Sequence, residues 1–130
     1  KARLLLNRFE MSDKTDKLGK ELSKGMQQKL SICCALLPEP KVVLFDEPFV
    51  GLDPHAIKEL KAVMTELRYD ECAVLISTHM LDSVEEFWDK ALIMRNGQIA
   101  AVRERKEIEQ SGEDLEKLFF EITEGRGENQ

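Results

Sequence analysis

The chain has 130 residues, of which 42% are apolar, and this suits one folded domain or part of one rather than a disordered segment. No apolar run approaches the roughly 18 residues that a membrane-spanning helix needs, and the first residues do not read as a signal peptide, so any membrane contact is expected through a partner. The net charge is −6, and residues 66–130 carry 16 acidic against 8 basic side chains, which argues against broad contact with nucleic acid.

The first third of the chain reads as two helices around a polar turn. Residues 1–11 have the pattern of the end of a helix, and residues 12–21 are polar and turn-like. Ser23 is the expected N-cap of the second helix, which the prolines at 38 and 40 end. The apolar face of this helix is expected to carry Leu30, Cys33, Cys34 and Leu37.

The cysteines have no pattern that indicates a metal site or a redox pair. There are three of them, an odd number, and none has metal-ligand spacing. We therefore expect buried structural thiols in a reducing compartment at Cys33, Cys34 and Cys72.

The middle of the chain predicts a strand, a helix and a second strand. KVVLF at 41–45 is a short β-rich apolar run, typical of a strand buried on both faces. Asp53 is an expected N-cap, with Pro54 at the first helical position. CAVLIS at 72–77 is expected to be a second buried strand. The helix between the strands has apolar residues at helical spacing at Ile57, Leu60, Met64 and Leu67.

The last third of the chain predicts a helix, a hairpin and a charged helical region. Thr78 is a candidate cap for a helix that carries Leu81, Val84 and Phe87. Residues 91–102 predict a hairpin around Asn96 and Gly97, a type I′ turn signal. From about Arg103 the chain reads as helical and charged up to a frayed tail at 125–130. Strand, helix, strand, helix, strand is the order of an α/β fold with a parallel sheet.

Two adjacent acids follow the first strand. In an open α/β sheet ligands collect at the carboxyl ends of the strands, so Asp46 is placed to serve Mg²⁺, often through water, and Glu47 to orient and polarise a water. An ordinary charged turn explains the pair equally well when it is taken alone. His79 follows the second strand by two residues and is placed to donate a hydrogen bond to a phosphate oxygen, although a lone histidine is more often a surface or capping residue.

The start of the second helix, Ser23-Lys24-Gly25, is suited to an anion. A helix N-terminus offers free backbone N–H groups and the positive end of the dipole. Gly25 lets an anion approach the backbone closely, Ser23 adds a hydroxyl and Lys24 adds a charge. The alternative is a simple cap with a surface lysine. Glycine in the first turn lowers helix stability by roughly 1 kcal/mol. That cost is easier to understand if a ligand must approach the backbone closely.

The order LSKGMQQ, VVLFDEP, GLDP and STH, from about Leu4 to Val102, strongly resembles the second half of an ATP-binding cassette (ABC) ATPase. The resemblance implies a partial P-loop NTPase core with parallel strands, a C-terminal hairpin and the end of the helical subdomain. It implies catalytic roles for Glu47 and His79, and Mg²⁺ binding through water at Asp46. The residues that would contact the ATP of a partner subunit are Ser23, Lys24, Gly25, Gln27 and Asp53.

The sequence departs from the family pattern at three places and lacks the family's first half. Lys24 stands at the usual first glycine, Met26 at the usual glutamine, and Phe49 where Thr or Ser is common. The phosphate-binding loop G-x-x-x-x-G-K-[ST] is absent, because Gly19-Lys20 is followed by glutamate. We therefore expect that this chain alone neither binds ATP tightly nor hydrolyses it.

The missing strand has a structural consequence. In this class of ATPase the phosphate-loop strand lies between the strands expected at 72–77 and 90–95, and the strand at 41–46 pairs with 72–77 in parallel. Its absence leaves two unpaired edges. We expect the sheet to collapse across the gap, or a swapped strand or an oligomer to form.

The resemblance implies an ATPase subunit that couples ATP binding and hydrolysis to transport by a separate membrane subunit. The Ser-Lys-Gly-Met signature is similar to that of bacterial exporters. The expected partners are a second ATPase subunit in a head-to-tail dimer and an integral membrane permease, with no nucleic acid, at the cytoplasmic face of the cell membrane. Two alternatives are a soluble ABC ATPase of DNA repair or translation and a non-catalytic regulatory cassette. The expected parts are the end of the helical subdomain at 1–37, the distal ATPase core at 38–102 and a C-terminal helical extension and tail at 103–130.

Overall fold

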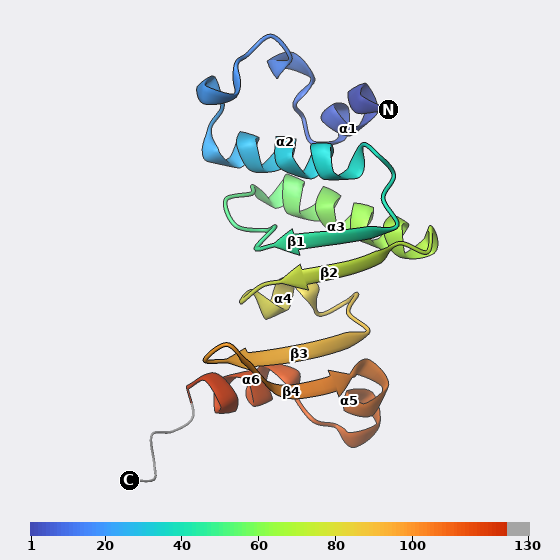
Figure 1. The fold of residues 1–130 in the computed structure, drawn as a ribbon, viewed down its shortest axis with the longest axis vertical. Helices are drawn as coiled ribbons and strands as arrows, with labels where there is room; N and C mark the ends of the chain where they lie inside the picture. Colours follow the sequence, from blue (N-terminus) through green and yellow to red (C-terminus); the bar gives the residue numbers. More distant parts are fainter. Residues whose placement is uncertain (125–130) are drawn as a thin grey trace. The chain divides into compact units, whose positions relative to one another are not determined.

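A computed structural model of the chain describes residues 1–124 (Figure 1). The chain forms two compact units, and the first ends at Met80. The first unit contains helix α1 (Ala2–Arg8), two short 3-10 helices (Ser12–Lys14 and Gly19–Glu21), α2 (Lys24–Leu36), β1 (Val42–Asp46), α3 (Pro54–Tyr69) and β2 (Ala73–Ser77). The second contains α4 (Leu81–Val84), β3 (Lys90–Arg95), β4 (Gln98–Glu104), α5 (Arg105–Ser111) and α6 (Leu115–Thr123).

Strands β1 and β2 form a parallel pair, as the resemblance implied. The register runs from Val42 opposite Ala73 to Asp46 opposite Ser77. Helix α3 connects the two strands and packs against β2 (Figure 1). Val43 and Phe45, which alternate along β1, are 4% and 6% exposed. The pair therefore has one covered face, and its two carboxyl ends lie at the same edge.

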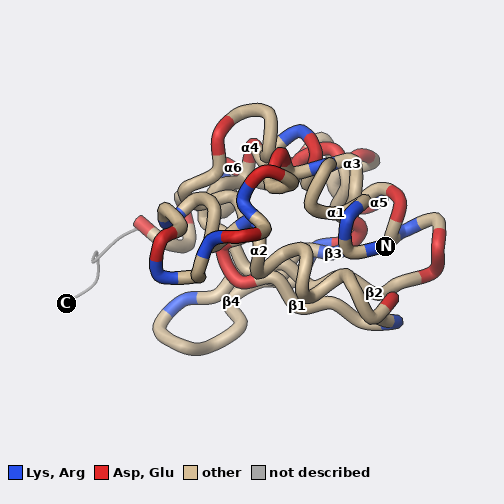
Figure 2. Tube along the Cα trace, turned by 90° about the horizontal axis from the view of Figure 1, so that it is seen from above, with Lys and Arg blue, Asp and Glu red and all other residues tan. Residues whose placement is uncertain are grey.

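The expectation that both strands are buried on both faces is wrong. Val42 and Leu44 on β1 are 61% and 72% exposed, and Leu75 on β2 is 54% exposed. The reason is the alternation of side chains along a strand, because helices of this unit cover only one of the two faces. Residues 42–45 carry no charged side chain, and the trace at the β1 label is tan in Figure 2. The apolar run predicted the strands correctly but not the missing cover.

The two helix starts at Ser23 and Asp53 were correctly predicted. The Ser23 hydroxyl accepts a hydrogen bond from the backbone N–H of Met26 (3.2 Å), and the Asp53 carboxylate accepts one from Ala56 (2.9 Å), as N-caps do. The buried face of α3 contains Leu60 and Met64 as expected, together with Ala56 and Val63.

The predicted face of α2 was right at Cys33 and wrong at Cys34 and Leu37. The residues that α2 buries are Lys29, Ile32, Cys33 and Leu36, whereas Leu37 is 44% exposed and Cys34 is also exposed. The buried stripe is therefore rotated from the predicted one, and it includes a lysine. Cys33 and Cys72 are buried as expected, and Cys34 is not.

The second unit contains the predicted hairpin. Strands β3 and β4 pair antiparallel around Asn96 and Gly97, whose φ angles of 52° and 76° are both positive, as a type I′ turn requires. Strand β4 continues to Glu104, so the helical region begins at Arg105 rather than Arg103. Helix α5 ends at Gly112 in the left-handed conformation (φ 69°).

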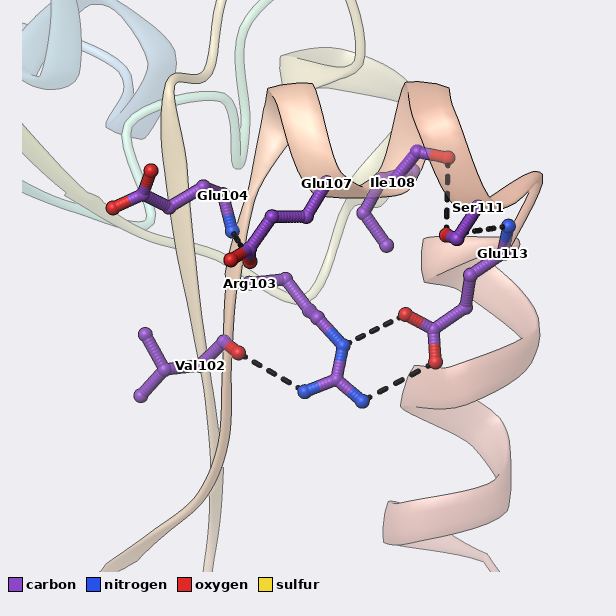
Figure 3. Close-up of polar contacts among 7 residues, drawn as sticks. All are labelled: Val102, Arg103, Glu104, Glu107, Ile108, Ser111 and Glu113. Atoms are coloured by element: carbon purple, nitrogen blue, oxygen red, sulfur yellow. Dashed lines mark hydrogen bonds and ion pairs between the residues drawn. The ribbon is translucent and has the colours of Figure 1, made fainter.

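Arg103 connects β4 to the start of α6. Its Nε lies 2.7 Å from Oε2 of Glu113 and its Nη2 lies 3.2 Å from Oε1 (Figure 3). The paired charges raise the pKa of Arg103 and lower that of Glu113. Helix α4 is a single turn, shorter than predicted, and it ends before Phe87. The predicted frayed tail, residues 125–130, lies outside the described residues.

Each unit has its own sheet. Among residues 1–124 the hydrogen-bonded strand pairs are β1 with β2 in the first unit and β3 with β4 in the second. The collapse of the sheet across the gap, the swapped strand and the oligomer stay predictions. Within the same residues, no helix combines the length and the apolar character needed to cross a membrane.

Candidate functional site

The carboxyl ends of β1 and β2 bring Asp46, Glu47 and His79 together. Asp46 is the last residue of β1 and lies opposite Ser77, the last residue of β2. The Ser77 hydroxyl donates a hydrogen bond to Oδ1 of Asp46. Two residues later along the chain, His79 turns back to Glu47. A parallel register therefore places at one edge of the sheet three residues from two distant parts of the sequence.

Glu47 is held by both its backbone and its side chain. Its N–H donates to the carbonyl oxygen of Ser77 (2.8 Å), and its φ of 44° lies in the left-handed region that few non-glycine residues adopt. Its Oε1 accepts a hydrogen bond from the backbone N–H of His79 (3.2 Å) and lies 2.7 Å from Nδ1 of the same histidine. A conformation of this kind persists when the surroundings over-determine it, and it is common at active sites.

The other oxygen of Glu47 has no partner. Oε2 is buried and has no hydrogen-bond partner. It is the one buried side-chain nitrogen or oxygen atom among residues 1–124 that lacks such a partner. A buried carboxylate oxygen without a donor is costly. The Glu47 side chain as a whole is 37% exposed, and the His79 side chain beside it is 70% exposed. Glu47 thus has one oxygen fixed by His79 and one without a hydrogen-bond partner among residues 1–124.

The signature residues lie at the N-terminus of α2. The Ser23 and Lys24 side chains are exposed. The side-chain amide of Gln27 donates to the carbonyl oxygens of Gly19 (3.0 Å) and Leu22 (3.3 Å), so it fastens the segment ahead of the helix.

The close approach expected at Gly25 is made by the chain itself. A Cβ added there would lie 2.7 Å from the carbonyl oxygen of Gly51. That distance is too short for any side chain, which explains the glycine without an anion.

Asp53 has partners within the chain. In addition to capping α3, its Oδ2 lies 2.8 Å from Nζ of Lys29. The ammonium group lowers the pKa of Asp53 to about 2, with help from the N–H of Ala56. Lys29 is 8% exposed, and sequence reasoning missed it. The available signal was its position four residues after Gly25, on the same face of the helix.

Two further neighbours of the site were not fully anticipated. Gln28 donates from Nε2 to the carbonyl oxygen of Pro48 (3.2 Å). Phe49, one of the departures from the family pattern, is 2% exposed and belongs to the core of the first unit. Its apolar side chain therefore packs in the core, and this burial explains why an apolar residue can stand where Thr or Ser is common.

The oxygen donors at the strand ends fit Mg²⁺. Mg²⁺ usually keeps several waters and is held by one or two carboxylates plus substrate phosphates. Asp46 supplies one such carboxylate, and the neighbouring Ser77 hydroxyl is a further oxygen atom beside it. Residues 1–124 contain no group of three or more His, Cys, Asp or Glu side chains arranged to enclose a metal ion. This set therefore suits an ion that arrives with its own phosphate and water ligands.

Known proteins resemble this chain in sequence. Residues 11–81, more than half of the chain, match the family described as "AAA domain, putative AbiEii toxin, Type IV TA system". The ABC-type transporter ATP-binding protein EcsA of Bacillus subtilis (strain 168) is 40% identical over 123 residues, which cover 92% of this chain and 50% of EcsA. The lipopolysaccharide export system ATP-binding protein LptB of Haemophilus influenzae is 32% identical over 120 residues, 92% of this chain and 49% of LptB.

The fold leads to the same family. A solved structure described as the ATP-binding subunit of an ABC transporter superimposes with a TM-score of 0.84 at 36% identity, over 92% of this chain and 51% of that one. The chain belongs to this AAA-domain family and is similar to ATP-binding proteins of ABC transporters. It spans about half the length of the curated relatives it matches. The α/β fold with a parallel pair and an antiparallel hairpin matches about half of the solved ATP-binding subunit.

Proposed function

We propose that the chain is the C-terminal part of an ABC transporter ATPase subunit, and that Glu47 is its catalytic base. The observation that carries this proposal is the state of the Glu47 carboxylate. One oxygen is fixed by two contacts to His79, and the other is buried without a donor. A carboxylate in this condition is prepared to accept a hydrogen bond from a water and to direct it at a phosphorus atom.

His79 and Asp46 complete the proposed chemistry. His79 orients Glu47 through Nδ1 and offers its exposed ring to the charge that spreads over the γ-phosphate oxygens. Asp46, fixed by the Ser77 hydroxyl, would hold Mg²⁺ through water. That ion, when bound, neutralises charge on the phosphates of ATP. The sequence contains no G-x-x-x-x-G-K-[ST] motif, so in this proposal the phosphate loop would not be among the 130 residues.

The N-terminus of α2 is the proposed contact with a second subunit. Ser23 and Lys24 are exposed at the start of a helix of 13 residues, where free N–H groups favour a phosphate, and Gly25 follows them against the Gly51 carbonyl oxygen. A head-to-tail dimer would bring this end to the ATP held by its partner. Gln27 and Asp53 stay proposed contacts to that ATP, and within the chain they contact the backbone ahead of the helix and Lys29, respectively.

Transport follows from the same proposal. The relatives named above are ATP-binding proteins of transporters, one of them of an export system, and this does not favour a role in DNA repair or a purely regulatory cassette. The proposed membrane partner is a separate permease, which would place the subunit at the cytoplasmic face of the membrane. Residues 1–37 would end the helical subdomain, 38–102 would form the distal core and 103–130 a C-terminal extension.

The test is hydrolysis of ATP by the full-length protein with and without Glu47→Gln. We expect the variant to lose at least about 100-fold in kcat and to form ATP-dependent dimers that persist. Glu86→Gln, at an exposed glutamate far along the chain, is the matched control. Normal hydrolysis by Glu47→Gln would remove Glu47 from this role. For residues 1–130 alone, calorimetric titration with ATP and Mg²⁺ is expected to show no micromolar binding.

A further inference from the structure

The N-terminal half of α2 is fastened to the loop between Glu47 and Asp53 at three points. Lys29 forms an ion pair with Asp53 (Nζ to Oδ2, 2.8 Å). Gln28 donates from Nε2 to the carbonyl oxygen of Pro48 (3.2 Å). Gly25 leaves room for the carbonyl oxygen of Gly51, which would lie 2.7 Å from a Cβ at this position. The contacts include both ends and the middle of the loop.

The three helix residues lie on one face of α2. Positions 25, 28 and 29 are separated by three and four residues, the spacing that places side chains next to one another on a helix. The same helix begins at Ser23, the proposed contact with the nucleotide of the partner subunit, and the loop begins at Glu47, the proposed base. This face therefore joins the two parts of the site that sequence reasoning treated separately.

Of the three contacts, the Lys29–Asp53 ion pair is the one that involves a buried charged residue. It is 8% exposed, and a buried ammonium group must be paired or it costs free energy. Its partner Asp53 is also the N-cap of α3, so the position of this carboxylate is fixed from two sides. The contact with Lys29 lowers the pKa of Asp53 to about 2.

We infer that Lys29 is a positioning residue that locks the 47–53 loop to α2, so that Glu47 and the Ser23 end of the helix keep a fixed geometry. This inference rests on the proposed ATPase function. The ammonium group of Lys29 contacts Asp53 within the chain. It acts through Asp53 and the loop, so its loss changes the alignment of Glu47 rather than the affinity for ATP.

The experiment compares Lys29→Met, Lys29→Arg and Asp53→Asn in the full-length protein, with Arg8→Met as control. Methionine keeps the length of the lysine stem without its charge, and asparagine keeps the N-cap at position 53 while removing the ion pair. Arg8 pairs with Glu59 and Glu66 away from the loop. We expect Lys29→Met and Asp53→Asn each to lower kcat about tenfold, with KM for ATP changed less than twofold.

The double variant and the conservative variant separate positioning from stability. Lys29→Met with Asp53→Asn is expected within about twofold of Lys29→Met alone, because both remove one ion pair. Lys29→Arg keeps at least half of the wild-type kcat. Arg8→Met lowers the melting temperature without lowering kcat. A kcat for Lys29→Met within twofold of wild type, or a loss in Arg8→Met of the same size at equal stability, would overturn the inference.

Hydrogen exchange provides a readout that does not depend on activity. Lys29→Met is expected to raise amide exchange in peptides from residues 47–53 and 22–30, and Arg8→Met is not. If the wild-type protein does not hydrolyse ATP, the proposed function fails, and the exchange data alone decide whether Lys29 fixes the loop. Unchanged exchange in both segments would show that it does not. If Lys29→Met does not fold, Asp53→Asn and Lys29→Arg give the same comparison.

Discussion

Both the ring nitrogen Nδ1 and the backbone N–H of His79 contact one oxygen of Glu47, at 2.7 Å and 3.2 Å. Two contacts to a single oxygen fix the rotation of the carboxylate and leave the second oxygen unpaired. The orientation of Glu47 therefore depends on a residue that is 32 positions further along the chain and comes close through the parallel pairing of β1 and β2.

Replacement of His79 by alanine is expected to reduce turnover of the full-length ATPase about 100-fold, a typical loss when one hydrogen-bonding group of a charged transition state is removed. The side chain is 70% exposed, so stability should change by less than about 0.5 kcal/mol. Steady-state hydrolysis and thermal unfolding measure the two effects. The other histidine, His55, supplies the control, and equal losses in His79→Ala and His55→Ala would contradict the assignment.

Gly25→Ala is expected to destabilise the protein by about 1 to 3 kcal/mol, the cost of overpacking. The new methyl group would meet the Gly51 carbonyl oxygen at 2.7 Å, and this oxygen belongs to the backbone. Gly19→Ala is a matched control, because a Cβ there has nothing within 4 Å. Urea unfolding of the two variants gives the comparison. Equal stabilities would show that the loop yields easily to a side chain at position 25.

The Lys29–Asp53 ion pair gives a defined pH dependence. The pKa of Asp53 is lowered from 3.8 to about 2 in the folded protein, so the pair stabilises the fold above pH 4 and loses its contribution as the pH falls through 2. The carboxylate is 49% exposed, which limits the effect to about 1 kcal/mol. NMR titration of the Asp53 carboxyl carbon should give a midpoint near 2 in the wild type and a higher one in Lys29→Met. A midpoint near 3.8 in the wild type would rule out the pair in solution.

The three thiols should differ in reactivity. Burial raises the pKa of Cys33 to about 11, so little thiolate is present at pH 8, whereas Cys34 is exposed. Because the thiolate is the reactive form, iodoacetamide should label Cys34 first, and Cys34→Ser should remove the fast phase. A fast phase that survives in Cys34→Ser would indicate that Cys33 or Cys72 opens to solvent.

Local signals predicted the elements well. Asp53-Pro54 gave the start of α3, and Asn96-Gly97 gave the hairpin turn, because each depends on a few adjacent residues. The gathering of Asp46, Glu47 and His79 followed from one non-local rule, that parallel strands end at the same edge of a sheet.

What the sequence did not reveal depends on packing between segments. The pairing of Lys29 with Asp53 depends on the fold, because the two residues lie in different elements. The spacing from Gly25 indicates only that Lys29 shares a helix face with it. The reason for Gly25 was likewise hidden, because the carbonyl oxygen that approaches it comes from a loop 26 residues further on. The apolar composition of β1 and β2 did not predict their uncovered face, because an apolar run does not show whether another element packs on that face.

The open face of the parallel pair has a practical consequence for anyone who produces these residues by themselves. Val42, Leu44 and Leu75 form an exposed apolar surface, and surfaces of this kind favour association between molecules. Purification would then need detergent or low concentration. Leu44→Lys, at the most exposed of these positions, would place a charge on this face and reduce association between molecules.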